Sequence, residues 1–295
     1  MQIVIRLKEK LVLIRNYFVC IYYRILAVLR FFPLPMNEKA DFVVAMASYP
    51  ERIHQVPIVI ESIARQTIKP RKIYLILTDN EWPGKIIPFS LQRLEGKGLE
   101  IIWTPISYNV KKLIPVLIRH PDLSIITVDD DFIFEKKTLE YLVNTEKLNP
   151  RSVVGYFGKA IYRKGRELGM MFRQKAGPKY FCISDDIYMM SGCTLYSNNS
   201  LDKRVLNMDG INKIVPGRGS DIWFWAASVA ANSAIICIKK PGDKKVGIPI
   251  PENKKTITKH NPGAEELEKK FQASIDYFGI REKLIETLPE FNDLN

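Results

Sequence analysis

The order of apolar and polar positions predicts alternating strands and helices over the first half of this 295-residue chain. Short β-branched runs that end in polar residues predict buried strands, and apolar residues three and four positions apart predict helices. The expected strands are residues 42–47, 72–78, 99–104, 124–128 and 153–157. The expected helices are residues 56–66, 111–118 and 136–148, the second interrupted by Pro115. This alternation is typical of an α/β fold with an open, mainly parallel sheet and flanking helices.

After about residue 158 the pattern changes to glycines, short apolar runs and loops. In this half we expect one helix at residues 222–232, one strand at 234–238 and a further helix near the C-terminus. The chain has no internal repeats. The pattern therefore predicts four parts, which are an N-terminal helix at 1–36, two halves of a domain at 41–158 and 159–240, and a lysine-rich loop with a C-terminal helix at 241–295.

The N-terminal segment from Leu11 to Phe32 is apolar and aromatic, but three arginines interrupt it. A spanning helix needs about 20 mostly apolar residues, and each central arginine costs about 2.5–3.5 kcal/mol, so we do not expect this segment to span a membrane. No small-residue cleavage site follows it, which argues against a signal peptide. We expect a helix on an anionic membrane surface. The alternative is a helix packed on the domain or on a partner.

The basic residues of this segment do not form one polar face. At 100° per residue Arg6, Lys10 and Arg24 fall on one side of the helix, whereas Lys8, Arg15 and Arg30 fall roughly opposite. A simple interfacial helix would keep them together.

The net charge of +12 is concentrated in two short stretches. Residues 1–40 hold seven basic and two acidic side chains, and residues 239–260 again hold seven and two. This distribution favours local docking surfaces over nucleic-acid binding. The four cysteines show no zinc-like spacing, which indicates a reducing compartment. We therefore expect a cytoplasmic protein on the inner face of the cell membrane.

Three consecutive aspartates, Asp129 to Asp131, follow the expected strand 124–128 directly. On an extended backbone Asp129 and Asp131 point to one side and Asp130 to the other. Divalent cations such as Mg²⁺ or Mn²⁺ bind to carboxylates arranged in this way together with substrate phosphates. The alternative is an acidic turn in which one aspartate caps the following helix. Because parallel sheets bind ligands beyond the carboxyl ends of their strands, Ser48, Tyr49 and Asp79 are site candidates as well.

Six short motifs in this order resemble the GT-A-fold glycosyltransferases, in particular bacterial family 2-like enzymes of surface-polysaccharide assembly. The motifs span residues 42–238 and are A-S-Y-P-E-R at 47–52, S-I-A-R-Q-T-I-K-P-R-K-I at 62–73, K-K-L-I-P-V-L at 111–117, V-D-D-D at 128–131, S-G-C-T-L-Y at 191–196 and S-D-I-W-F at 220–224. The resemblance implies a GT-A-type fold. It also implies a nucleotide-sugar donor, a glycan or lipid-linked acceptor and a divalent metal, Mn²⁺ or Mg²⁺.

The resemblance also implies roles for individual residues. Residues 41–158 would bind the donor, and residues 159–240 would form the acceptor side. The donor contacts would be Ser48, Tyr49 and Arg52 near the nucleoside, Asp79 near the base or ribose, Lys111 or Lys112 at the diphosphate, and Asp129 and Asp130 at the end of the strand. Asp129 and Asp131 would hold the metal on the diphosphate, and the motif at 191–196 would form a wall of the sugar pocket.

Asp221 matches the position of the family's catalytic base, which implies an inverting transfer. Where the family often has an acidic pair, this chain has Ser220 and Asp221; an ordinary helix cap is the alternative for Asp221. His260 is a candidate third metal ligand, and Asp185 with Asp186 are candidates for contacts with acceptor or sugar hydroxyls. For these three residues a solvated loop is the alternative.

Two other functions remain open on the sequence alone. A sugar-phosphate nucleotidyltransferase would also combine an α/β sheet with a carboxylate-bound metal. For that enzyme class we would expect a glycine-rich phosphate-binding loop after the first strand. A non-catalytic, basic membrane-surface protein would show its charge as a stripe with interleaved aromatic residues.

Overall fold

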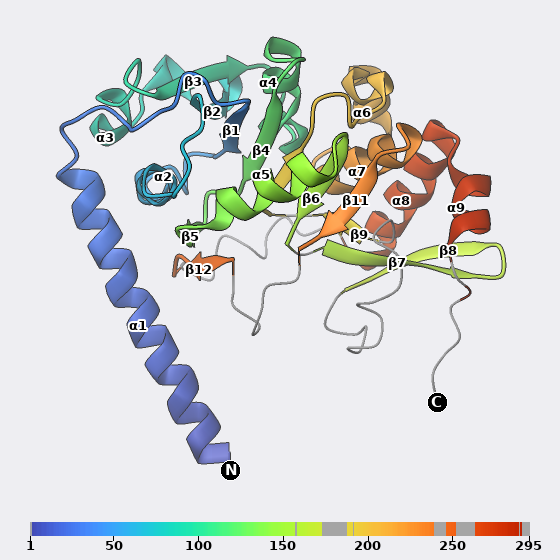
Figure 1. Cartoon of the computed structure of the whole chain (residues 1–295), viewed down its shortest axis with the longest axis horizontal. Helices are drawn as coiled ribbons and strands as arrows, with labels where there is room; N and C mark the ends of the chain where they lie inside the picture. The colour runs from blue at the N-terminus through green and yellow to red at the C-terminus, as the bar shows by residue number, and fades with distance from the viewer. Residues whose placement is uncertain are drawn as a thin grey trace.

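The computed structural model describes residues 2–156, 158–172, 188–190, 192–238, 246–251, 263–288 and 290. Its centre is a seven-stranded sheet, shown in Figure 1. In spatial order the strands are β11 (Ala234–Cys237), β6 (Ser152–Gly155), β10 (Thr194–Tyr196), β4 (Ser124–Val128), β1 (Phe42–Ala47), β2 (Ile73–Thr78) and β3 (Leu99–Thr104). Among these seven strands only β10 runs antiparallel to its neighbours. The predicted open, mainly parallel sheet is thereby confirmed.

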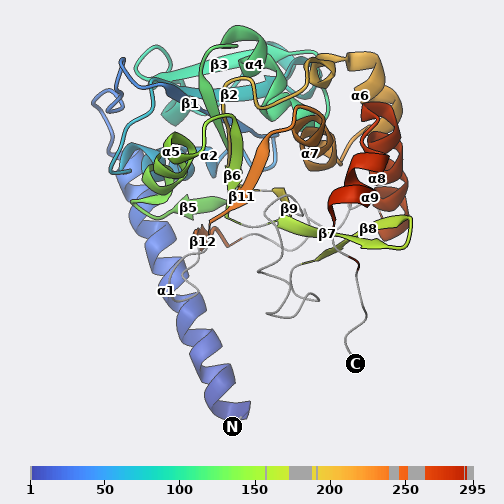
Figure 2. The ribbon, with the colours of Figure 1, turned by 45° about the vertical axis from the view of Figure 1, so that its right-hand side comes forward.

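Helices cover both faces of the sheet, as Figures 1 and 2 show. One face packs against α4 (Ile114–Arg119), α6 (Met208–Ile214), α7 (Ser220–Ala230), α8 (Ala264–Phe278) and α9 (Arg281–Thr287). The other packs against α1 (Gln2–Val28), α2 (Val56–Ala64), α3 (Phe89–Gln92) and α5 (Thr138–Leu148). Strands buried on both faces read as continuous apolar runs, because neighbouring side chains enter opposite cores. In β1, Val43 and Ala45 join one core while Val44 and Met46 join the other.

Helix α2 is buried on every side, since all nine of its residues are buried. Its buried Glu61 accepts hydrogen bonds from Arg30 Nε at 2.5 Å and Arg30 Nη2 at 2.9 Å. Arg30 follows the end of α1, and α1 packs along α2. The N-terminal helix therefore completes the core around α2.

Two small sheets lie outside the central one. Strand β5 (Phe132–Phe134) pairs with β12 (Gly247–Pro249), and β7 (Gly158–Lys164) pairs with β8 (Glu167–Phe172) and β9 (Tyr188–Met190). The apolar pattern predicted neither of these sheets, nor β10 or α6. Four of these strands have three residues each, which is too short to show a period.

The prediction that Pro115 interrupts a helix is wrong. The preceding residues form the 3₁₀ turn η3 (Asn109–Lys112), and Pro115 lies in the first turn of α4. A proline is tolerated there because the first-turn N–H groups have no partner within the helix. Further 3₁₀ turns are η1 (Asp79–Glu81), η2 (Pro83–Lys85) and η6 (Lys203–Leu206).

Candidate active site

A cavity of about 880 Å³ lies at the carboxyl ends of β1 and β4. Three connections supply most of its lining, namely the loop after β1, the turn η3 and the aspartates after β4. The predicted site residues that line it are Ser48, Tyr49, Arg52, Lys111, Lys112, Asp129, Asp130 and Asp131, and they are joined by Glu81, Ser107, Asn109, Gly217 and Arg218. The structure therefore brings together residues that lie up to 170 positions apart in the chain.

The pairing of β1 with β4 places Ser48 beside Asp130. The last paired residues are Met46 and Val128, so the two chains leave the sheet side by side. Ser48 Oγ donates a hydrogen bond to Asp130 Oδ2 at 2.6 Å, and both residues are buried. This bond fixes the central aspartate between the two strand ends.

Arg52 holds two of the three aspartates. Its Nη1 lies 3.1 Å from Asp130 Oδ1, and its Nη2 lies 2.5 Å from Asp131 Oδ2. Burial alone would lower the pKa of Arg52, but the two carboxylates outweigh burial and raise it. Arg52 is therefore a permanent cation here, and its fork fixes the directions of both carboxylates.

This grouping differs from the one that an extended backbone predicts. The chain turns at Asp130 and Asp131, so the alternation of side chains stops after β4. Asp130 and Asp131 share Arg52, whereas Asp129 faces another cation. Burial raises the pKa of Asp130 to about 7, against the opposing effects of Arg52 and Ser48.

Lys112 joins Asp129 to Asp221. Its Nζ lies 3.2 Å from Asp221 Oδ1 and 3.9 Å from Asp129 Oδ1. Burial acts to lower the pKa of Lys112, but Asp221 and Asp129 outweigh it and raise it. Burial also raises the pKa of Asp129, with Lys112 opposing. The predicted base thus lies in an ion-pair network that reaches the aspartates after β4.

The loop before α7 determines where Asp221 lies. Gly219 occupies the N-cap position of α7 with φ +128°, a conformation that side chains other than glycine rarely adopt, and a Cβ there would lie 3.3 Å from Lys270. Lys270 Nζ, from α8, donates to the carbonyl oxygens of Pro216 and Arg218 at 2.7 and 2.9 Å. Asp221 therefore belongs to the first turn and is not the N-cap residue, so its carboxylate is directed to Lys112.

Lys111 and Asp79 have different surroundings. The buried Lys111 Nζ donates to Thr78 Oγ1 at 2.7 Å, at the end of β2, and to Glu81 Oε2 at 2.9 Å, in η1. Asp79 pairs with Lys85 at 3.1 Å and is not among the cavity-lining residues. Glu81, two positions further on, lines the cavity instead.

The carboxylates fit a divalent cation only with help from a substrate. Within the described residues, no group of three or more His, Cys, Asp or Glu side chains is placed to hold a metal ion by itself. Asp131 Oδ1 is nevertheless buried without a hydrogen-bond partner, and the Asp129 side chain is 41% exposed. Together with Asp130 and Asp221 they make four carboxyl groups, against the two cations Arg52 and Lys112. Mg²⁺ typically takes one or two carboxylates and completes its shell with water and substrate phosphates.

Several candidates lie outside the described residues, namely Asp185, Asp186, His260 and most of the lysine-rich segment 239–260. Three further residues near the site, Glu81, Arg218 and Lys159, are not among the residues predicted from the sequence. Burial lowers the pKa of Lys159, and the carboxylate of Asp221 acts in the opposite direction. Arg218 was accessible to sequence reasoning, because it lies between two glycines just before Asp221.

No family model matches this sequence, and no curated protein matches it. Among solved structures, the chain is similar to residues 1–349 of TarS from S. aureus, with 12% identity and a TM-score of 0.41, over 68% of this chain and 58% of that one. The chain therefore spans a little over half of that solved chain.

Two further structures are similar at the same level. A mannosyltransferase from Pyrobaculum calidifontis, in complex with GDP-Man and Mn²⁺, shares 11% identity over 95% of this chain and 86% of its own, with a TM-score of 0.43. Glucosyl-3-phosphoglycerate synthase from Mycobacterium tuberculosis, in complex with Mn²⁺, UDP and phosphoglyceric acid, shares 13% identity over 84% of this chain and 79% of its own, with a TM-score of 0.44. Similarity at this distance assigns no activity to the chain.

Proposed function

We propose that this chain is a glycosyltransferase of the GT-A type. It moves a sugar from a nucleotide-sugar donor to a hydroxyl group of a glycan or lipid-linked acceptor, with Mn²⁺ or Mg²⁺ and with inversion at the anomeric carbon. The observation that carries the proposal is a cavity lined by three consecutive aspartates and by Lys112, whose Nζ lies 3.2 Å from Asp221 Oδ1 and 3.9 Å from Asp129 Oδ1. A nucleotidyltransferase would favour a glycine-rich loop after β1, and residues 48–52 contain no glycine.

The donor would lie along the loop after β1, where Ser48, Tyr49 and Arg52 line the cavity. Asp129 and the unpartnered Oδ1 of Asp131 would hold the metal ion, which, when bound, would offset the negative charge of the diphosphate. Arg52 keeps Asp131 in position by holding its other oxygen. Lys112 would supply a further positive charge at the diphosphate.

Asp221 would act as the general base. The acceptor oxygen forms the new bond to the anomeric carbon as the bond from that carbon to the diphosphate oxygen breaks. The hydroxyl proton passes to the Asp221 carboxylate, and the nucleoside diphosphate leaves with the electron pair. Lys112 pairs with Asp221 and lies near Asp129. It would balance the negative charge of Asp221 before the proton transfer and that of the leaving diphosphate afterwards.

The test is a screen of UDP-, GDP-, CDP- and dTDP-sugars with Mn²⁺, with Mg²⁺ and with EDTA. A donor at a hundredfold excess over its Kd should stabilise the fold by about 2.7 kcal/mol, measured as a rise in melting temperature. Asp129→Asn and Asp131→Asn should remove the metal-dependent part of that rise. Asp209→Asn is the matched control, because Asp209 is an exposed aspartate in the first turn of α6, away from the cavity.

The products separate the alternatives. A glycosyltransferase releases nucleoside diphosphate, whereas a nucleotidyltransferase exchanges pyrophosphate with a nucleoside triphosphate. The anomeric configuration of a transferred sugar, measured by NMR, tests inversion. If no donor shifts the melting temperature with either metal and no nucleoside diphosphate is released, the proposal is wrong and the protein is not this type of enzyme.

A further inference from the structure

Helix α1 has an inner face that is fixed to the body of the protein. Asn16, Cys20 and Ala27, spaced along this face, are buried. At the end of the helix Arg30 pairs with the buried Glu61, and Arg93 Nη2 donates to the carbonyl oxygens of Ala27 and Val28. The helix is therefore held against the body along its second half.

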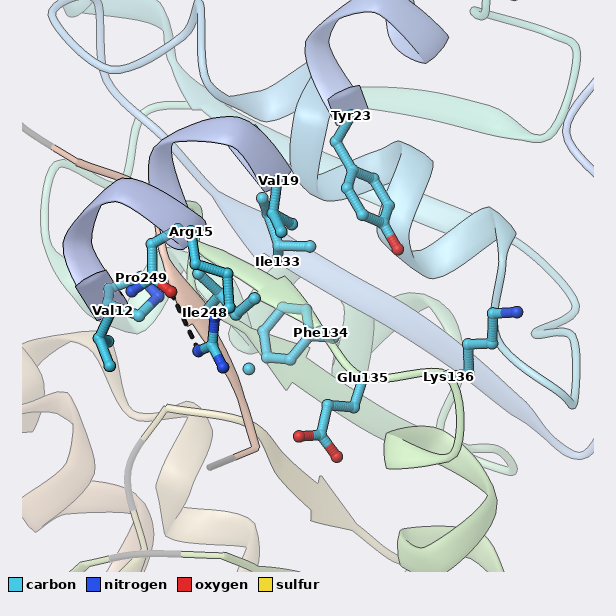
Figure 3. A pocket seen from close by; sticks show the side chains of 12 residues that line it. Val12, Arg15, Val19, Tyr23, Ile133, Phe134, Glu135, Lys136, Ile248 and Pro249 are labelled. Atoms are coloured by element: carbon cyan, nitrogen blue, oxygen red, sulfur yellow. Dashed lines mark hydrogen bonds between the residues drawn. The ribbon is translucent and has the colours of Figure 1, made fainter. Parts of the chain in front are cut away.

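The inner face also borders the β5–β12 pair. A hollow of about 530 Å³ lies between them, lined by Val12, Val19 and Tyr23 from α1 and by Ile133 and Phe134 from β5, as Figure 3 shows. The side chains of α1 from Val12 onward thus face protein on this side. These contacts fix the orientation of α1 relative to the body.

The opposite face of α1 is apolar and has no cover among the described residues. Leu11, Ile14, Phe18, Ile21 and Ile25 recur at three and four positions, so they form one stripe. Their exposed fractions range from 37% at Ile21 to 64% at Phe18. Monomeric proteins seldom expose continuous apolar surface on this scale, and such a surface usually marks contact with a membrane or another protein.

The basic residues of α1 flank this stripe. Lys10 and Arg24 lie on one side of it and Arg15 on the other, and all three are exposed. Between residues 10 and 32 there is no acidic side chain. The basic residues of α1 therefore lie on two sides of the helix because one face packs on protein and the opposite face is apolar. From these two borders of the stripe the cations can reach lipid phosphates.

The apolar surface continues beyond the helix. Phe31 and Phe32 follow it, 72% and 80% exposed, and Phe89 at the start of α3 is 73% exposed. Arg93, which ends α3, holds the last carbonyls of α1 and lies over the ring of Phe31 at 5.4 Å. These contacts join the end of α1 to α3, and the two elements lie near one another in Figure 1.

The contacts of α1 with the body fall inside its most apolar stretch. Within the described residues, Lys10–Val28 is long and apolar enough to cross a membrane by length and composition. Asn16, Cys20 and Ala27 of this stretch are nevertheless buried against the body, so one side of it faces protein and not lipid. A helix docked in this way favours a position at the membrane surface.

We infer that α1 is a monotopic anchor that lies along an anionic phospholipid bilayer. Its stripe of Leu11, Ile14, Phe18, Ile21 and Ile25 enters the lipid, the flanking cations contact lipid phosphates, and Phe31, Phe32 and Phe89 extend the anchored surface. The inference does not depend on the proposed activity. It assigns the partner by two properties of one surface, namely its apolar stripe and the exposed cations Lys10, Arg15 and Arg24 on both borders of that stripe.

The test uses the full chain and sedimentation with vesicles of phosphatidylcholine, with and without phosphatidylglycerol. The wild type should bind the anionic vesicles. Phe18→Asn combined with Ile25→Asn should lower the partition coefficient by about tenfold or more, because two side chains leave the lipid. The control is Ile118→Asn combined with Leu148→Asn, two side chains 63% and 83% exposed on α4 and α5, which should bind like the wild type.

A second pair of variants tests the charges. Arg15→Gln combined with Arg24→Gln should remove most of the preference for anionic over neutral vesicles while the apolar stripe stays intact. Phe32→Asn combined with Phe89→Asn should lower the vesicle partition coefficient less than Phe18→Asn combined with Ile25→Asn. Each variant should keep the melting temperature of the wild type without lipid, since all the changed side chains are exposed.

Three outcomes would overturn the inference. The first is equal vesicle binding by the stripe variant and its control. The second is a wild-type dimer that the stripe variant dissociates while vesicle binding stays unchanged, which would make a second copy the partner. The third is protection of an N-terminal tag from protease in sealed vesicles, which would show that the helix spans. Digestion of the tag on bound protein supports the interfacial position.

Discussion

Two cations hold the three aspartates of the cavity and the neighbouring Asp221, and they do so in different ways. Arg52 contacts Asp130 and Asp131 at 3.1 and 2.5 Å, and the Asp130 side chain is almost inaccessible. Lys112 lies 3.2 and 3.9 Å from Asp221 and Asp129, whose side chains are 34% and 41% exposed. The first group has the shorter distances and a buried carboxylate at Asp130, whereas both carboxylates of the second group are more exposed to solvent.

The difference follows from the chemistry of the two cations. A guanidinium is planar and presents its donors in a fixed fork, so it fixes the carboxylates that it binds. An ammonium is a compact charge on a flexible stem, and it can exchange one partner for another without a fixed geometry. We therefore expect the Arg52 group to hold the site in shape and the Lys112 group to take part in the reaction.

The largest effect is expected at Asp221. Asp221→Asn should lower turnover by about 10²–10⁴ because it removes the proton acceptor, while the free energy of unfolding and the metal-dependent affinity for the donor stay close to those of the wild type. The stability should survive because Asp221 is not the N-cap residue of α7. Steady-state kinetics with the donor found by the screen provide the measurement.

Asp209→Asn serves again as the control for this prediction, since it changes a first-turn aspartate of another helix. Near-normal turnover of Asp221→Asn would mean that Asp221 only neutralises Lys112. The Lys112 group would then have no role in the reaction, and the two cation groups would differ only in structure.

The next effect is expected at Arg52. Arg52→Met should destabilise the fold by about 3–5 kcal/mol, because it leaves the buried carboxylate of Asp130 without its charge partner. Lys112→Met should cost less, since the side chains of Asp129 and Asp221 are partly exposed and keep access to water. Urea unfolding at pH 8 without metal gives both values.

Equal losses of stability for the two variants would show that both groups are structural. The control is Arg52→Met combined with Asp130→Asn, which removes the unpaired charge as well. This double variant should recover part of the stability.

Much of the fold could be predicted from the sequence, because long apolar runs leave few alternatives. The strands at 42–47, 99–104 and 124–128 have the predicted limits. Residues that follow the carboxyl ends of these strands line one cavity. The antiparallel β10 could not be found, because three residues carry no period. The assignment of Pro115 failed for a local reason, since one proline is equally compatible with the interior break and the first turn of a helix until the helix start is known.

The details of the candidate site depend on contacts that the sequence does not encode locally. An extended backbone would have grouped Asp129 with Asp131, but the turn after β4 changes the direction of the side chains. The separate directions of Lys111 and Lys112 result from the 3₁₀ turn η3, which points one towards Glu81 and the other towards Asp221. The roles of these residues stay predictions until they are tested.

The smallest effect sharpens the comparison through pH. Burial raises the pKa of Asp130 to about 7, so between about pH 4 and 7 the folded protein binds a proton that the unfolded chain has released. The contribution of Asp130 to the free energy of unfolding should therefore fall as the pH rises through this window, by at most about 1.4 kcal/mol per pH unit. Asp130→Asn keeps an acceptor for Ser48 and should remove this fall, as measured by urea unfolding from pH 4 to 8 in EDTA. The exposed Asp209→Asn is the control and should follow the wild type. If Asp130→Asn shows the same pH dependence as the wild type, Arg52 already holds Asp130 fully ionised, and the close group then differs from the Lys112 group in geometry alone.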